Sequence, residues 1–95
     1  MPILHIDFET HSTVSIKVVG AWRYATHAAT DVWCAAYAVD DGPVKLWKPG
    51  DPVPQEIVTA ANDWFVAAHN ANFERQIIQH IMMPRYGWPQ IPLAQ

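Results

Sequence analysis

Two carboxylates near the amino terminus have the spacing of metal ligands. Asp7 and Glu9 stand two residues apart in segment 3–9, where apolar and polar side chains alternate as in a β-strand. Side chains two apart on a strand share a face, so these carboxylates are expected side by side. Adjacent like charges repel unless protons or cations intervene, and Mg²⁺ prefers oxygen ligands of this kind. The alternative is that this face simply meets solvent.

A third carboxylate, Glu74, lies in a segment with helical periodicity. At about 100° per residue, the apolar side chains of residues 73–83 form a stripe, and Glu74 falls in its middle. A carboxylate on a buried face is costly unless it is paired or bound to a metal. The alternative is a partly buried Glu74 in the first helical turn, favoured by the helix dipole.

The elements that would position these residues indicate an α/β fold with a mixed sheet of about four strands and two helices. Residues 11–30 have no clean period and are expected to be irregular, with one short helix over 22–25. Asn70 or Asn72 can cap the last helix, and Pro84 with Gly87 is expected to end it. No helix or strand is predicted in the tail, 88–95. We expect strands at 3–9, 32–39, 44–47 and 64–69, and helices at 55–61 and 73–83.

The connections between these segments predict their order in the sheet. Residues 49–63 are long enough for a crossover, so strand 64–69 is expected parallel to and beside strand 3–9. Pro43 and the neighbouring lysines are typical of an edge strand at 44–47. Segment 32–39 is apolar on both faces, which favours a strand covered on both sides.

This arrangement would bring the carboxylates together. The helix that follows a parallel fourth strand begins near the carboxyl end of the first strand, where open α/β sheets place their sites. We therefore expect the carboxylates of Asp7 and Glu74 to approach within roughly 4 to 7 Å. With Glu9 they would supply three of the ligands that a pair of metal ions needs.

At these residues the chain resembles the DEDD (DnaQ-like, RNase H-fold) 3′→5′ exonucleases. It is most similar to the proofreading-type domains of phage-like family A DNA polymerases. The resemblance runs from Leu4 to Glu74. The family's first motif, Asp-x-Glu-Thr, and its second, Asn-x-x-(Tyr/Phe)-Asp, are matched by Asp7, Glu9, Thr10, Asn70, Phe73 and position 74.

The resemblance implies a partial RNase H-like fold and a hydrolase that uses two Mg²⁺ or Mn²⁺ ions to cleave the terminal phosphodiester at a single-stranded DNA 3′ end. It implies that Asp7 bridges both ions, that Glu9 binds the ion on the nucleophile side, and that Glu74 binds the other. It places Thr10, Asn70 and Phe73 near the terminal nucleotide. It also implies a polymerase domain in the parent chain as a partner.

The sequence departs from the family's pattern in two ways. Position 74 is Glu where most members have Asp, so an extra methylene must be absorbed. The third motif, Tyr or His with a later Asp, has no match, since no acidic residue follows Glu74. Residues 1–95 are therefore expected to form one truncated exonuclease domain that lacks its last strand and helix. We expect it to be inactive or weak alone, and to self-associate through the uncovered sheet edge.

Composition limits the other functions. The 95 residues are 51% hydrophobic and 16% charged, which is typical of a globular domain. A net charge of -3 provides no basic surface for nucleic acid, so contact with DNA would depend on metal ions or on further sequence. A lone cysteine, Cys34, forms no internal disulfide and is expected to be buried, as suits the cytoplasm. The longest apolar run, 32–39, is far shorter than the roughly 20 residues that span a bilayer.

Other interpretations stay open. The chain could be a non-catalytic RNase H-like module that binds nucleic acid or a polymerase, or an unrelated α/β domain with an accidental motif match. Zinc is disfavoured because the spacing of His5, His11, His69 and His80 matches no finger or metalloprotease pattern. The five tryptophans are more typical of core and loop packing than of platforms for base stacking.

Overall fold

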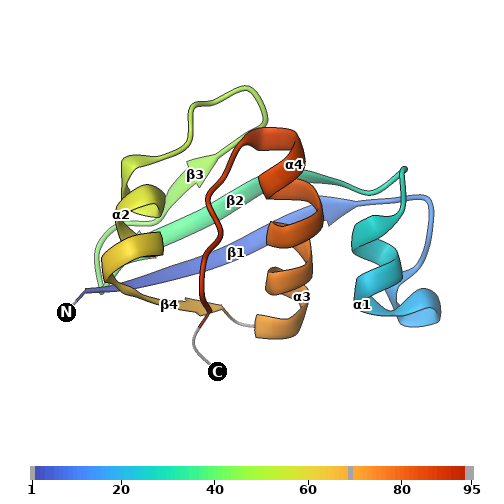
Figure 1. Cartoon of the computed structure of the whole chain (residues 1–95), viewed down its shortest axis with the longest axis horizontal. Coiled ribbons are helices and arrows are strands. Elements are labelled where there is room, and N and C mark those ends of the chain that lie inside the picture. The colour runs from blue at the N-terminus through green and yellow to red at the C-terminus, as the bar shows by residue number, and fades with distance from the viewer. Residues whose placement is uncertain (1, 69, 94–95) are drawn as a thin grey trace.

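A four-stranded mixed sheet forms the centre of the computed structural model, which describes residues 2–68 and 70–93 (Figure 1). The strand order is β3-β2-β1-β4. The predicted parallel pairing of the first and fourth strands is confirmed, and so is the edge position of the third. Both other pairings, β1 with β2 and β2 with β3, are antiparallel. The strands are β1 (Ile3–His11), β2 (Asp31–Val39), β3 (Lys45–Trp47) and β4 (Phe65–Ala68).

Helices cover one face of this sheet and extend beyond its end. In Figure 1, α2 (Gln55–Asp63) and α3 (Ala71–Ile77) lie in front of the strands, and α1 (Ile16–Thr26) lies beside α3 beyond the end of the sheet. The alternation in β1 explains this one-sided cover, because its apolar side chains point into the core under the helices. Those side chains, Leu4, Ile6 and Phe8, are all buried.

The opposite face of the sheet is uncovered. We call it the open face and define it by the exposed residues of β1 that point there: Ile3, His5, Asp7, Glu9 and His11. The prediction that the second strand is covered on both sides is wrong. Trp33 of β2 is 64% exposed, and Cys34, expected to be buried, is only half-buried.

The segment before β2 is more regular than predicted. Instead of a short helix over 22–25, α1 spans Ile16–Thr26 and is broken by Gly20, which has φ 83 and ψ 166. Glycine adopts this positive φ without the clash that a Cβ would cause. The break shifts the helical period within α1, which is why no single period is visible in the sequence.

The last helix is longer than predicted and changes its geometry. Asn70 accepts a hydrogen bond from the Phe73 amide, so the predicted cap is confirmed. After α3 the chain widens into a π-helical turn, η1 (Ile78–Met82), and continues as α4 (Met83–Tyr86). Pro84 does not end the helix; it lies at the start of α4, directly after the π-helical turn. Gly87 does end it, with φ 73.

Residues 88–93 form no helix or strand of their own, as predicted, but they pack back onto the sheet. Leu93 makes a parallel bridge with Val66 of β4. Trp88 is 3% exposed, and its ring lies 5.7 Å from Phe8 and 5.3 Å from Trp47. Among the described residues no helix is long and apolar enough to cross a membrane.

Candidate metal centre

The end of β4 creates the space in which the acidic residues meet. The last pair of the parallel ladder joins Ile6 to Ala68, so from Asp7 onward β1 has no neighbouring strand on that side. α3 begins only three residues later, and its first turn brings Glu74 against this free stretch of β1. Glu74 is 1% exposed there, although it is a carboxylic acid. The apolar stripe predicted to bury Glu74 is therefore confirmed.

The surroundings of Glu74 disfavour its negative charge. Burial, the charge of Asp7 and a hydrogen bond with the Asp7 carboxylate raise the pKa of Glu74 to about 8, and the charge of Glu9 adds to this. The backbone N–H of Phe8 acts in the opposite direction by stabilising the carboxylate. At neutral pH and without a cation, the folded chain therefore favours the protonated form of Glu74.

The pair also has unused binding capacity. The Oε2 atom of Glu74 is buried and has no hydrogen-bond partner among the described residues. Buried polar atoms in folded proteins rarely lack a partner, so an orphaned carboxylate oxygen indicates an ion or a water at this position. Carboxylate oxygens are the ligands that Mg²⁺ and Mn²⁺ favour.

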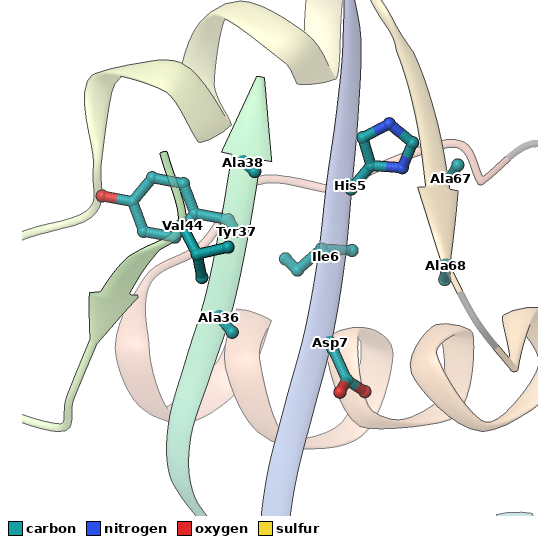
Figure 2. Close-up of a pocket in the computed structure, with 9 residues that line it drawn as sticks. All are labelled: His5, Ile6, Asp7, Ala36, Tyr37, Ala38, Val44, Ala67 and Ala68. Atoms are coloured by element: carbon teal, nitrogen blue, oxygen red, sulfur yellow. The ribbon is translucent and has the colours of Figure 1, made fainter. Parts of the chain in front are cut away.

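Asp7 connects this buried acid to the open face. Figure 2 shows Asp7 beside Ala36 at one end of a hollow of about 610 Å³ on that face. The hollow exists because β1 is flanked by small side chains, Ala36 and Ala38 on β2 and Ala67 on β4. A ligand that approached over the open face would thus reach Asp7, with Glu74 behind it.

Glu9 completes the acidic group only in part. It is exposed on the same face as Asp7 and contributes to the raised pKa of Glu74. Within residues 2–68 and 70–93, however, no three or more His, Cys, Asp or Glu side chains are grouped closely enough to hold a metal ion. The structure thus joins Asp7 and Glu74 as a pair, and a direct ligand role for Glu9 stays a prediction.

The three residues expected near a terminal nucleotide have structural contacts. The Thr10 hydroxyl lies 2.9 Å from the Tyr24 hydroxyl, and Asn70 caps α3. Phe73 is half-buried, and its ring lies 6.2 Å from that of Tyr24. The two contacts with Tyr24 join α1 to the end of β1 and to α3, next to the acidic pair. Whether these residues also touch a nucleotide stays a prediction.

Two features of the site were not predicted. His5 lines the hollow on the open face, two residues before Asp7. His11 and Trp33 form an exposed stacked pair beyond Glu9. The alternation of segment 3–9 already placed His5 on the face of Asp7 and could have identified it. The position of Trp33 depends on an irregularity in the β1–β2 ladder that no residue pattern signals.

Comparison with known proteins gives one informative relative. The chain is 39% identical over 82 residues to a protein named DNA polymerase from Bacillus phage SP02. The match covers 82% of this chain but 13% of that polymerase, so the chain spans a small part of its relative's length. No family model and no solved structure matches. The chain is therefore related in sequence to part of a phage DNA polymerase.

Proposed function

We propose that this chain is part of a two-metal-dependent 3′→5′ exonuclease of the proofreading type, acting on the 3′ end of single-stranded DNA. The observation that carries this proposal is the Asp7–Glu74 pair. A fully buried carboxylic acid against a second carboxylate destabilises the fold when both are ionised, and proteins keep such arrangements mainly where function requires them.

The residues fit a divalent cation. Asp7 is exposed toward the open face while Glu74 is held behind it by α3, so the two could hold an ion from two sides. Magnesium or manganese bound there would supply a charge that activates water and stabilises the leaving 3′ oxygen. The chain's own part is to hold Asp7 on a rigid strand, to exclude water from Glu74, and to present Glu9 on the same face.

The relative supports the proposal independently of the site. A nuclease that removes nucleotides from a DNA 3′ end would act on the product of a DNA polymerase, and the relative is named a DNA polymerase. The mixed sheet with its parallel β1–β4 pair and a helix entering beside β1 is compatible with a partial RNase H-like fold. A polymerase domain in the parent chain is accordingly the proposed partner.

The set of ligands within this chain is incomplete for two ions. Three carboxylates have proposed roles, and no acidic residue follows Glu74. Two-metal hydrolysis needs both ions at a fixed separation, and misplacement of about 1 Å can cost about 100-fold in rate. We therefore expect the 95 residues alone to be at most a feeble nuclease, whereas a longer chain that adds a further carboxylate would be active.

Digestion of a 3′-labelled single strand in Mn²⁺ tests this proposal. The chain, its Asp7→Ala variant and a longer polymerase-derived chain would be compared, with Asp63→Asn as the control, because Asp63 is an exposed acid at the end of α2. The proposal expects 3′→5′ digestion by the longer chain that Asp7→Ala abolishes and Asp63→Asn preserves. A longer chain without metal-dependent nuclease activity would instead favour a non-catalytic module that binds nucleic acid or the polymerase.

A further inference from the structure

A β-bulge at the end of the open face places an unusual pair of side chains next to the acidic site. The β1–β2 register joins Glu9 to Cys34 and Thr10 to Val32, so Trp33 is the extra residue on β2. Bulges recur beside active sites, where they redirect a side chain. Here the redirected side chain is Trp33, which is 64% exposed although tryptophan is ordinarily among the better buried residues.

Trp33 is held in place rather than projecting freely. Its ring lies 5.4 Å from the imidazole of His11, at an interplanar angle of 29°, which is a stacked arrangement. His11 is exposed and has the same strand parity as Asp7 and Glu9, so the stacked pair belongs to the open face. Along β1, His11 is four residues from Asp7, or roughly 13 Å at about 3.3 Å per residue.

The chemistry of this pair suits a nucleobase. Aromatic side chains bind the bases of single strands by stacking, which requires no positive charge and tolerates any sequence. That property matters in a chain with six basic and nine acidic residues, where contacts to phosphate cannot dominate binding. A DNA strand whose terminal phosphodiester reached Asp7 would extend along β1, over the open face, toward the stacked side chains of Trp33 and His11.

We propose that Trp33 and His11 form a stacking platform for a base of single-stranded DNA, upstream of the terminal nucleotide. This inference rests on the proposed function, because it takes the acidic pair as the position of the 3′ end. The platform selects unpaired DNA, since the bases of a duplex are already stacked on one another. It would thus restrict the site to frayed or displaced 3′ ends.

Binding of a fluorescein-labelled oligothymidylate to the full chain tests the platform by anisotropy, in EDTA and in Mn²⁺. Trp33→Ala should weaken binding by at least about fivefold in both conditions, given that one stacked base contributes about 1–3 kcal/mol. Trp33→Phe should restore most of the affinity. Trp22→Ala is the matched control, because Trp22 is 58% exposed and also contacts an imidazole, His80, but lies on α1. It should have little effect.

The outcomes separate the platform from the metal centre. Equal affinities for Trp33→Ala and Trp22→Ala overturn the platform, as does binding of a blunt duplex as tight as that of the single strand, or no binding by the wild-type chain. Glu74→Gln in the same titration reports on the metal centre, because it should remove only the increase in affinity that Mn²⁺ produces. If Trp33→Ala weakens binding while Mn²⁺ has no effect, the platform stands and the proposed metal centre fails.

Discussion

Replacing Glu74 with glutamine should remove a large part of the pH dependence of folding stability. In the folded chain the pKa of Glu74 is raised to about 8, first by burial and then by Asp7, from an ordinary value of 4.5. Between these two values the folded protein holds a proton that the unfolded chain has released. Raising the pH through this window therefore removes stability.

The size of the effect follows from the two pKa values. Each tenfold change in proton affinity corresponds to about 1.4 kcal/mol, so the wild-type chain should lose about 1.4 kcal/mol per pH unit between roughly pH 5 and pH 8, about 4 kcal/mol in all. This is a large share of the 5–15 kcal/mol by which domains are typically stable. Above about pH 8 the loss should level off.

Glutamine is the informative replacement because it has nearly the shape of protonated glutamic acid and can donate to Asp7 as that acid does. Near pH 5, Glu74→Gln and the wild-type chain should be about equally stable. Near pH 8 the variant should be more stable by several kcal/mol. A mutation in a fully buried position that stabilises the fold is unusual, since most such changes destabilise it.

Urea unfolding followed by tryptophan fluorescence measures this difference. Both chains would be unfolded in EDTA at steps between about pH 5 and pH 8, and the wild-type midpoint should fall by roughly 0.5–1 M urea per pH unit relative to the variant. The comparison cancels the titration of the histidines, which both chains share. Parallel pH curves for the two chains would refute the reasoning, because they would show that Glu74 ionises in the folded state as it does in the unfolded one.

Three further predictions concern the frame around the site. Tyr86→Phe removes a 2.7 Å hydrogen bond to the Asp31 carboxylate that joins α4 to β2. It should lower the free energy of unfolding by about 1–2 kcal/mol in urea titrations. No change would mean that the bond is not formed in solution. Gly87→Ala places a Cβ at φ 73 and should cost about 1 kcal/mol, whereas an unchanged unfolding midpoint would contradict the left-handed cap. The chain should self-associate in sedimentation velocity, since Leu46 and Phe65 are 60% and 58% exposed, and Phe65→Glu should reduce this; a wild-type chain that is monomeric at high concentration would count against it.

Periodicity revealed the parts of the fold that alternate cleanly. The two-residue period of β1 separated core from open face, and the helical stripe after Asn70 placed Glu74 in the interior, where the structure has it. The crossover length of residues 49–63 predicted the parallel β1–β4 pair, and from that the meeting of Asp7 with Glu74. Both predictions depend on simple geometry that a single sequence contains.

The features that could not be predicted arise from local departures from regular geometry. Gly20 breaks α1 and shifts its period, and the π-helical turn η1 lets the last helix continue through Pro84. Long-range packing is the second cause. Nothing local indicates that Trp88 would fill the core between Phe8 and Trp47, or that the bulge would turn Trp33 outward.

Mn²⁺ binding to the chain tests most directly whether Asp7 and Glu74 together hold a divalent cation. Free Mn²⁺ would be followed by electron paramagnetic resonance at about pH 7.5 for the wild-type chain, Asp7→Asn, Glu74→Gln and the control Asp63→Asn. The wild-type and control chains should each bind Mn²⁺ at a site that either of the other substitutions removes. Equal Mn²⁺ binding by all four chains, or none by the wild type, would contradict it.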